Sequence, residues 1–313
     1  VVILDLNFNV LSANAAAKEI LEVKPEQQID FKDLESKLKS ADLSHSLSYY
    51  VGEKKVVNVQ EVKFKDRYYR LFLSPVRDIL LKEFIGAVII IEDITMAKMV
   101  DKMRTEIIST TSHQLRTPLS VIRGNLEMII NGDLGKIPKG QVEVLQEALA
   151  GNERMIKLVN DLTDVSKISE GSLGLNFKEE DFGRVVGEVV WNLIPIAGQN
   201  KVELIFKPSK EKFLVEIDGQ RVKQVIQNLV DNAVKYCPRD GSGKVELRLE
   251  KTDHSAELIV KDNGAGIPKD ENGKIFERFF RASNATKIDP GGGTGLGLFI
   301  AKSIIELHKG KIW

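Results

Sequence analysis

The sequence predicts a multidomain protein in which an α+β domain, an antiparallel helical hairpin and an α/β domain follow one another. Three observations lead to this. Strand-like and short helical segments alternate over residues 1–93, apolar residues recur at spacings of three and four over residues 94–171, and strands and helices alternate again over residues 172–313. A length of 313 residues fits two or three domains.

Composition excludes several classes of protein. Hydrophobic residues make up 42% and charged residues 29%, which is ordinary for a globular chain. Lys+Arg and Asp+Glu both number 45, so no net field favours nucleic acid or an anionic membrane. The single cysteine, Cys237, excludes an intramolecular disulfide and fits a reducing compartment such as the cytoplasm.

No run of about 18 apolar residues is present, so we expect no membrane-spanning helix in this chain. The chain starts at Val1 inside a strand-like run and stops at Trp313 inside another. Both ends therefore look cut. An upstream membrane anchor or further sensor stays open, and we expect membrane contact only through such a segment.

The first domain, residues 1–93, has strand signals at 56–64, 68–73 and 84–91, which are rich in β-branched and aromatic residues. A short helix is predicted near the start, with Ser12 as its N-cap. This mixture predicts an α+β fold.

The second domain, residues 94–171, is predicted to be a helical hairpin. Met96, Met99 and Met103 begin an amphipathic pattern that continues to Ile130, and the breakers of residues 131–138 end it. A second helix is predicted from about 141 to 169. Because the apolar stripe of such a hairpin needs a partner, a dimeric four-helix bundle is the simplest arrangement.

The third domain, residues 172–313, alternates strands and helices. Strands are predicted at 202–206, 213–217, 244–250 and 256–261, and helices at 182–198, 220–236 and 297–307. The glycine-rich, charged stretch between residues 267 and 294 shows little regular pattern and is long for a connection, which favours a functional lid.

A histidine in the first long helix carries the first chemical signal. Pro118 removes one backbone hydrogen bond and clashes with the carbonyl of Gln114, at a cost of ~3 kcal/mol, which loosens the helix beside His113. A single helical histidine is more often structural or merely exposed. The kink and the paired helix favour a functional histidine here.

The third domain carries the other signals. Asn228, Asn232 and Lys235 share one helical face, where amide oxygens suit Mg²⁺ and lysine suits a phosphate, although a solvated face is the alternative. The turn at 262–268 places a carboxylate beside glycines, and residues 291–298 open a helix whose free N–H groups suit phosphate.

These segments resemble a known family. Residues 112–119 resemble the phosphoacceptor box of sensor histidine kinases. Residues 228–236, 262–268, 276–281 and 291–298 resemble the N box, first glycine box, phenylalanine box and second glycine box of their ATPase domain. The resemblance covers roughly residues 96–313 and implies an α/β sandwich of the Bergerat type, shared with gyrase, a heat-shock chaperone and mismatch-repair ATPases, with ATP and Mg²⁺ as cofactors.

The resemblance also implies roles for individual residues. Asn232 would bind Mg²⁺, Asn228 would assist near the metal and phosphates, and Lys235 would contact phosphate. Tyr236 would pack by the adenine and Asp262 would accept a hydrogen bond from its amino group. Residues 269–290 would form the lid. The other residues that would line the nucleotide site are Gly264, Gly266, Ile267, Arg281, Thr294, Gly295, Leu296, Gly297 and Leu298.

Residues 1–93 resemble a PAS sensor domain more loosely, chiefly through the tripeptide Asp93, Ile94 and Thr95. The cysteine of flavin-binding members is absent there. A haem ligand role for His45 competes with an incidental surface position. A domain used only for dimerisation and signal relay is the simpler alternative.

Two features depart from or extend the pattern around the histidine. The family usually has a carboxylate directly after it, where this chain has Gln114, which can orient the ring but cannot accept a proton. Thr117 lies one turn after His113, where family members use Thr or Asn to orient water for phosphatase chemistry.

The ATPase domain also lacks the strand or two that normally follow the position of Trp313.

The leading hypothesis is an ATP-dependent protein-histidine kinase that autophosphorylates His113. It would act as a homodimer through the hairpin, pass the phosphoryl group to an aspartate of a response regulator receiver domain, and also dephosphorylate that regulator. A conformational ATPase of the gyrase or chaperone kind is disfavoured by the hairpin. A weak ATP-binding sensor with mainly phosphatase output is supported only by Gln114. The stimulus, the regulator and the choice of cis or trans transfer stay open.

Overall fold

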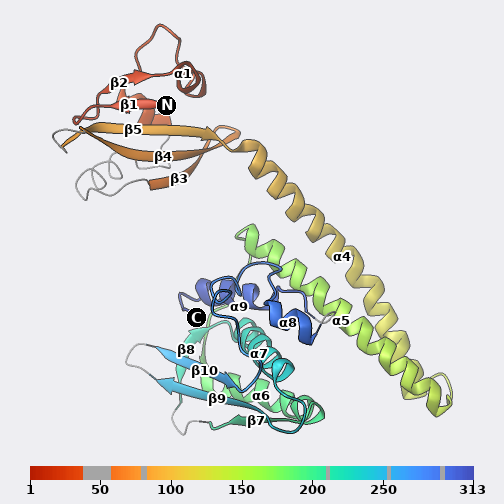
Figure 1. Cartoon of the computed structure of the whole chain (residues 1–313). Coiled ribbons are helices and arrows are strands. Elements are labelled where there is room, and N and C mark those ends of the chain that lie inside the picture. Colours follow the sequence, from red (N-terminus) through yellow and green to blue (C-terminus); the bar gives the residue numbers. More distant parts are fainter. Residues whose placement is uncertain (38–57, 79–82, 209–211, 252–254, 290–292) are drawn as a thin grey trace. The chain divides into compact units, whose positions relative to one another are not determined.

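The computed structural model describes residues 1–37, 58–78, 83–208, 212–251, 255–289 and 293–313. These residues form two compact units, Val1–Arg104 and Thr105–Trp313 (Figure 1). Among the described residues, no helix has both the length and the apolar character needed to cross a bilayer.

The first unit is built on a five-stranded sheet with the order β2-β1-β5-β4-β3, in which every neighbouring pair is antiparallel (Figure 1). This is the α+β fold that the sequence predicts. Its elements are β1 (Val2–Leu4), β2 (Val10–Ala13), α1 (Ala15–Ile20), α2 (Phe31–Lys37), β3 (Asn58–Phe64), β4 (Arg67–Arg77) and β5 (Phe84–Asp93).

The core of this unit follows from strand alternation. Along β4, Tyr69, Leu71 and Leu73 are buried, and Leu73 pairs with the buried Ile89 of β5. Gly86 of β5 has no space for a side chain, because a Cβ there would overlap the carbonyl oxygen of Leu4. A glycine is therefore required where β1 packs against β5.

The first helix begins two residues later than the sequence predicts. Asn14, not Ser12, is the N-cap of α1: its Oδ1 accepts a hydrogen bond from the backbone N–H of Ala17 at 3.0 Å. Ser12 lies within β2. Asparagine and serine cap helices about equally well, so capping preference alone does not distinguish the two positions. Ser12 is instead paired with β1 as part of strand β2, which leaves Asn14 to cap the helix.

The tripeptide Asp93, Ile94 and Thr95 joins the sheet to the long helix. The backbone N–H of Thr95 donates to Asp93 Oδ1 at 2.9 Å, and Thr95 Oγ1 accepts from the backbone N–H of Tyr68 at 2.9 Å. Hydrogen bonds from Thr95 hold the pKa of the Asp93 carboxyl below its usual range. The carboxylate therefore stays ionised at the start of the helix, where the helix dipole favours negative charge.

The two long helices are α4 (Thr95–Asn131) and α5 (Lys139–Ser169). Gly171, with φ of 64°, follows the end of α5, as its position in the sequence predicts. Each helix has an apolar stripe because its apolar residues recur every three or four positions.

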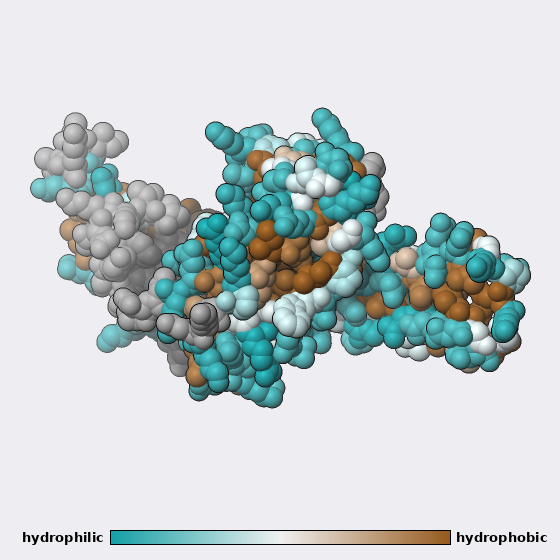
Figure 2. Space-filling model, turned by 90° about the horizontal axis from the view of Figure 1, so that it is seen from below, coloured by the Kyte–Doolittle hydropathy of each residue, from teal (hydrophilic) through white to brown (hydrophobic). Residues whose placement is uncertain are grey.

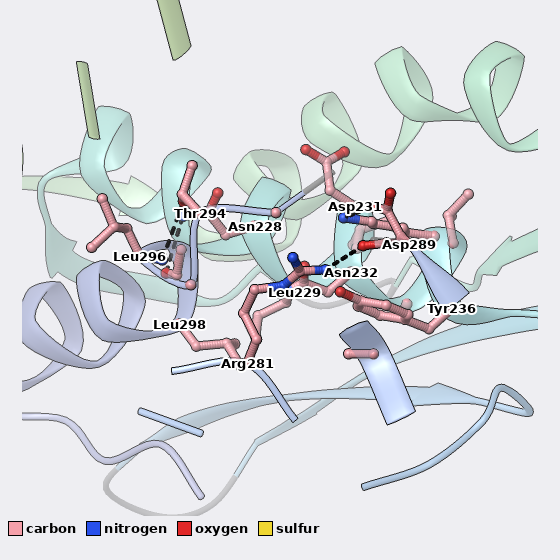
Figure 3. A pocket seen from close by; sticks show the side chains of 18 of the residues that line it. Asn228, Leu229, Asp231, Asn232, Tyr236, Arg281, Asp289, Thr294, Leu296 and Leu298 are labelled. Carbon is pink, nitrogen blue, oxygen red and sulfur yellow. Dashed lines mark hydrogen bonds and ion pairs between the residues drawn. The ribbon is translucent and has the colours of Figure 1, made fainter. Parts of the chain in front are cut away.

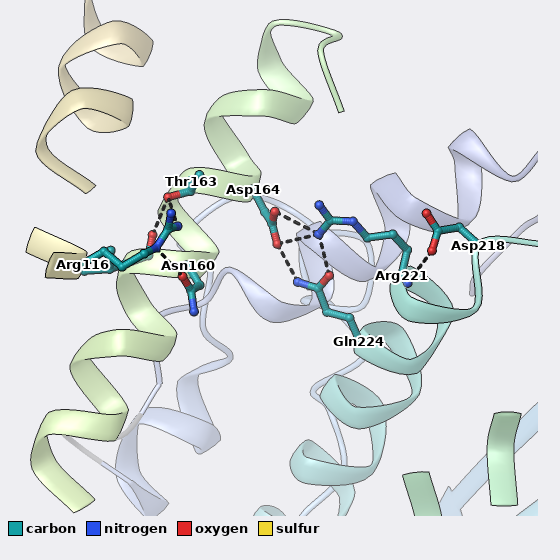
Figure 4. A network of polar contacts seen from close by, with 8 residues as sticks. Arg116, Asn160, Thr163, Asp164, Asp218, Arg221 and Gln224 are labelled. Atoms are coloured by element: carbon teal, nitrogen blue, oxygen red, sulfur yellow. Dashed lines mark hydrogen bonds and ion pairs between the residues drawn. The ribbon is translucent and has the colours of Figure 1, made fainter. Parts of the chain in front are cut away.

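Polar contacts connect α4 to α5 at three residues of α4. Ser166 Oγ donates to the Thr105 carbonyl at 3.1 Å, and Asn152 Nδ2 donates to the Leu119 carbonyl at 2.9 Å. Between them, Arg116 donates to Asn160 Oδ1 and to Thr163 Oγ1, each at 3.2 Å (Figure 4).

The remaining part of the second unit is an α/β layer structure. A sheet with the order β10-β9-β7 pairs β7 and β9 in parallel and β9 and β10 antiparallel, and β6 and β8 form a separate two-stranded ribbon. The elements are β6 (Lys178–Asp181), α6 (Phe182–Gln199), β7 (Val202–Phe206), β8 (Leu214–Ile217), α7 (Gly219–Tyr236), β9 (Gly243–Lys251), β10 (Ala256–Asp262), α8 (Ser283–Ile288) and α9 (Gly297–Leu307).

The helices α6 and α7 lie over one face of the three-stranded sheet and bury a common core (Figure 1). Val189 of α6, Ile226 of α7 and Val245 of β9 are each at most 5% exposed. Burying side chains of this size stabilises the fold by roughly 1.5–3 kcal/mol each. This core holds α7 in place, and α7 carries four of the predicted site residues.

A second cluster joins this layer structure to α5. Val165 of α5, Val225 of α7 and Ile300 of α9 are buried in it together. Beside it, Arg221 Nη1 donates to both carboxylate oxygens of Asp164 (Figure 4). The ATPase-like layer is thus attached to the second helix of the hairpin through both apolar and charged contacts.

Three details of the third domain differ from the prediction. Strand β6 was not predicted, because Lys178–Asp181 has no apolar alternation. The predicted lid contains a short helix, α8. The strand expected at Trp313 is not formed, and residues 310–313 have no regular secondary structure. A strand is stable only when a neighbour pairs with it, and none of the described strands does so here.

Candidate functional site

The structure brings most of the predicted nucleotide residues to one pocket. They come from α7, the turn after β10, the lid and the start of α9 (Figure 3), and residues of α5 and α6 also line the pocket. Gly264 is not among the lining residues, but it lies directly beneath Asp262 and Tyr236. The predicted residues that line the pocket are Asn228, Asn232, Lys235, Tyr236, Asp262, Gly266, Ile267, Arg281, Thr294, Gly295, Leu296, Gly297 and Leu298.

The two asparagines of α7 have different surroundings. Asn228 is 7% exposed, and its Nδ2 donates to the carbonyl of Gly297 at 3.2 Å. It therefore holds the start of α9 against α7. Asn232 lines the pocket and is half-buried, and no described residue hydrogen-bonds to its amide oxygen. That oxygen is available to a hard cation such as Mg²⁺.

Two cations of the pocket share one acidic residue. Lys235 Nζ lies 2.5 Å from Asp289 Oδ2. Arg281 Nη2 donates to the backbone carbonyl of Asp289 at 2.5 Å, and Figure 3 shows Arg281 and Asp289 side by side in the pocket. The hydrogen bond from Lys235 holds the pKa of the Asp289 carboxyl below its usual range. Sequence reasoning did not single out Asp289, since its partner Lys235 lies in a distant helix.

The turn after β10 is built around Asp262. Its Oδ1 accepts a hydrogen bond from the backbone N–H of Gly264 at 2.8 Å. A Cβ at Gly264 would lie 2.6 Å from the carbonyl oxygen of Tyr236, so a glycine is required there. Gly266 has φ of 66°, a conformation that favours glycine, and Ile267 is 46% exposed. Asp262 is thereby held at the exposed edge of the pocket.

Asn284 of α8 was missed by the sequence reasoning. Its Nδ2 donates to the carbonyls of Ala265 and Gly266, at 3.3 and 2.7 Å. These bonds connect the lid to the glycine turn. A single asparagine in an irregular stretch gives no sequence signal for such a role.

The second glycine segment leads into α9. Thr294 Oγ1 accepts from the backbone N–H of Leu296 at 3.2 Å, while Leu296 itself is 1% exposed and packs into the core. Gly295 has φ of 70°, and a Cβ there would lie 2.6 Å from the carbonyl carbon of Phe279. Because no side chain caps α9, its first N–H groups remain available to an anion at the pocket.

His113 does not line this pocket. It is exposed on α4, one turn before Pro118, and Thr117 is exposed on the following turn. Gln114 is also exposed, and among the described contacts none joins it to His113. Ser112, directly before the histidine, is 1% exposed.

Arg116 lies beside the histidine ring. Its Nη1 is 3.5 Å from His113 Nδ1, and its other nitrogens are held by Asn160 and Thr163 of α5. The sequence reasoning assigned it no role, although it lies within the motif. Its position three residues after the histidine on a helix was the available signal.

His308, the other histidine in the described part of the chain, has a structural setting. His308 accepts a hydrogen bond at Nε2 from the backbone N–H of Asp218 at 3.0 Å, and its Nδ1 lies 2.8 Å from the carbonyl of Ile304. It therefore connects α9 to the N-cap of α7. His45 and His254 lie outside the described residues.

The hairpin with an exposed histidine and the layered domain with its glycine-bordered pocket define a class. The chain belongs to the sensor histidine kinases of two-component systems. A family model described as histidine kinase-, DNA gyrase B- and HSP90-like ATPase matches residues 217–313, a His Kinase A phospho-acceptor domain model matches residues 103–171, and a PAS fold model matches residues 1–98.

Curated relatives carry the same class of name. The sensor histidine kinase WalK of Bacillus subtilis (strain 168) is 34% identical over 230 residues, which are 73% of this chain and 37% of that protein. A sensor protein kinase WalK of Staphylococcus aureus is 33% identical over 228 residues, which are 73% of this chain and 54% of that protein. The chain therefore spans about a third to a half of the length of these relatives.

Solved structures of histidine kinases are also similar. Acinetobacter baumannii histidine kinase AdeS shares 29% identity at a TM-score of 0.44, covering 64% of this chain and 89% of that one. Histidine kinase ThkA, solved in complex with the response regulator protein TrrA, shares 24% identity at a TM-score of 0.40, covering 100% of this chain and 90% of that one.

Proposed function

We propose that this chain is an ATP-dependent protein-histidine kinase that autophosphorylates His113 and passes the phosphoryl group to an aspartate of a response regulator. The observation that carries the proposal is the convergence of three separate sequence segments on one pocket. Residues from α7, from the turn after β10 and from the start of α9 line it together. An exposed histidine on a proline-containing helix of the same unit supplies the acceptor.

The proposed reaction is an in-line phosphoryl transfer. A ring nitrogen of His113 attacks the γ-phosphorus, the bond to the bridging oxygen breaks, ADP leaves, and the ring gives up its remaining proton to the solvent. Little covalent chemistry falls to the protein in such a reaction, so positioning and charge neutralisation provide most of the catalysis. A regulator carboxylate oxygen then attacks the phosphorus, the P–N bond breaks, and the leaving ring takes up a proton from the solvent, which regenerates the neutral ring and leaves an aspartyl phosphate.

Different residues of the pocket would contact different parts of the nucleotide. Asp262 would accept from the adenine amino group, Tyr236 would pack by the ring, and the N–H groups at the start of α9 would meet phosphate oxygens. Asn232, with Asn228, would hold Mg²⁺, and the amide oxygens fit that ion. A bound Mg²⁺ would neutralise charge on the phosphates. Lys235 and Arg281 add two fixed positive charges.

His113 lies outside the pocket, so transfer requires the ATPase domain to reach a histidine of this chain or of a second copy. A second copy fits the exposed apolar stripe of the hairpin. Brown, apolar side chains gather toward the loop end of the hairpin, at the right of Figure 2. The exposed apolar residues of α4 and α5 include Leu115, Val121, Ile122, Met128, Val144, Met155 and Leu158. A homodimer through a four-helix bundle would bury them.

We place this reaction in the cytoplasm. Cys237 is a buried free thiol, and reducing compartments keep thiols in that form. The first unit would act as the PAS-like sensor or relay for the kinase.

Incubation with γ-labelled ATP and Mg²⁺ tests the proposal. We expect acid-labile, alkali-stable label on the wild-type chain and none on His113→Gln, while both bind ATP equally. Label that survives on the variant would assign the acceptor elsewhere. Absence of label with intact ATP binding would leave only an ATP-binding sensor.

A second candidate is a weak kinase whose main output is dephosphorylation of the regulator. The observation that favours it is Gln114, which makes no described contact with His113 and cannot accept its proton. Thr117 would orient the attacking water in this reaction. Thr117→Ala should then slow release of phosphate from the phosphorylated regulator while sparing autophosphorylation. Equal loss of both activities would give Thr117 a purely structural role.

A further inference from the structure

The lid residue Asp289 interacts with two cationic side chains of the pocket, Lys235 and Arg281. Its Oδ2 lies 2.5 Å from Lys235 Nζ, and its backbone carbonyl accepts a 2.5 Å hydrogen bond from Arg281 Nη2. Lys235 extends from the end of α7, and Asp289 follows the last residue of α8. The side chains are about three-quarters buried, so solvent screens the pair only partly.

Both cations also face the glycine segment that leads into α9. A Cβ built at Gly293 would lie 3.3 Å from Lys235 Nζ and 3.5 Å from Arg281 Nε. Arg281 Nε is fully buried and, within the described part of the chain, has no hydrogen-bond partner. A buried donor without a partner is costly, so this nitrogen offers a bond to an anion that approaches along the glycine segment.

Asp289 supplies negative charge beside Lys235 and Arg281. The hydrogen bond from Lys235 lowers the pKa of the Asp289 carboxyl, and the charges of Arg281 and Arg239 lower it further. The carboxylate is therefore ionised at neutral pH. It supplies the negative charge that a nucleotide phosphate would otherwise supply to Lys235.

We propose that Lys235 and Arg281 form a phosphate subsite and that the Asp289 carboxylate occupies it when no nucleotide is bound. A nucleotide polyphosphate must displace this carboxylate in order to bind. The proposal rests on the proposed nucleotide site and adds a residue that sets its affinity and selectivity. A ligand with a polyphosphate breaks the pair between Lys235 and Asp289. Adenosine, which has no phosphate, leaves it intact.

Asp289 therefore lowers the affinity for ATP without lowering the affinity for adenosine. Because Asp289 ends α8, displacement also frees one attachment of the lid to α7. The hydrogen bonds from Asn284 of α8 to the glycine turn are not affected.

Calorimetric titration of Asp289→Asn and the wild type tests this, with ATP, tripolyphosphate and adenosine as ligands in the absence of Mg²⁺. We expect Asp289→Asn to bind ATP and tripolyphosphate about tenfold more tightly, which corresponds to about 1.4 kcal/mol, with adenosine unchanged. Asp289→Ala should behave in the same way, which separates loss of the charge from a new amide contact. Asp270→Asn removes the same charge from an exposed lid residue and should change nothing.

Each alternative result is decisive. Weaker ATP binding by Asp289→Asn would make Asp289 a nucleotide-positioning residue and overturn the proposal. Equal ATP binding by both chains, or the same gain in Asp270→Asn, would overturn it while leaving the nucleotide site standing. Absence of ATP binding by every chain would overturn the nucleotide site and this proposal together.

Discussion

Arg221 of α7 donates from Nη1 to both carboxylate oxygens of Asp164 on α5, at 3.0 and 3.1 Å (Figure 4). Gln224, one turn further along α7, donates to the same carboxylate at 2.7 Å. The side chain of Asp164 is only 12% exposed. Three hydrogen bonds therefore converge on one largely buried carboxylate and attach the ATPase domain to the hairpin.

Replacing Asp164 should loosen that attachment. Asp164→Ala leaves Arg221 without its carboxylate, so we expect the docked arrangement to lose roughly 1–3 kcal/mol. Faster hydrogen exchange of α7 and of residues 160–168 would report the change, with Asp133→Asn, in the exposed loop, as the control of equal charge. Unchanged exchange in α7 would mean that the apolar contacts around Val225 suffice.

Gln114→Glu should raise the rate of autophosphorylation by an order of magnitude or more. Positive charge develops on the ring as one nitrogen of His113 attacks phosphorus, and a carboxylate next to it can stabilise that charge and take up the proton. ATP affinity should stay the same, because Gln114 lies outside the pocket. Single-turnover labelling measures the rate.

Gln146→Glu provides the matched control for that experiment, since it adds the same charge at an exposed position of α5. A Gln114→Glu chain no faster than the wild type would show that docking of the domains, not proton removal, limits the step. Arg116, at 3.5 Å from the ring, would then be the next residue to vary.

Asp262→Asn and Asn232→Ala should separate two parts of the nucleotide site. The first removes a carboxylate acceptor for the adenine amino group, so ATP affinity should fall by ~1–3 kcal/mol with or without Mg²⁺. The second removes an oxygen ligand, so it should impair Mg²⁺-dependent transfer more than metal-free binding. Titrations with and without Mg²⁺ decide the matter. Equal loss under both conditions in both variants would reject the division of roles.

Asp161 gives a prediction about pH. It is 7% exposed, and burial raises its pKa to about 6, with Lys157 opposing the shift and Asp164 adding to it. From α7, Asp231 pairs with Lys157 and Arg221 pairs with Asp164. Because the folded state holds the proton more tightly than the unfolded state, stability is greatest at low pH in this range and falls as the pH rises through about 6.

Asp161→Asn removes the charge that has to be buried, so the variant should be more stable than the wild type at pH 7.5 by roughly 1–3 kcal/mol. The difference should shrink at pH 4.5, where the wild-type carboxyl is protonated in the folded state. Denaturant unfolding followed by circular dichroism at the two pH values measures it. A constant difference would indicate that the carboxyl is ionised at both.

The sequence predicted the parts of this fold that have a strong local signal. The spacing of Met96, Met99 and Met103 correctly indicated the long helix α4, and the pocket residues meet because each lies in a recognisable segment. Strand β6 was missed since its residues are all charged, and it exists only through its pairing with β8. The contact of Lys235 with Asp289 was missed because it forms only once distant segments have folded together.

The polar contacts between α4 and α5 have a mechanical consequence. Thr105, Arg116 and Leu119 are each bonded to a residue of α5, at positions that run in the opposite direction along that helix. Sliding α4 along its own axis by one turn would break all of them at once. Rotation or bending of residues 95–104, which precede the first contact, breaks none. The turn of α4 that carries His113 is therefore held in register with α5 by bonds on both sides of it, and a change of register requires all of them to break together.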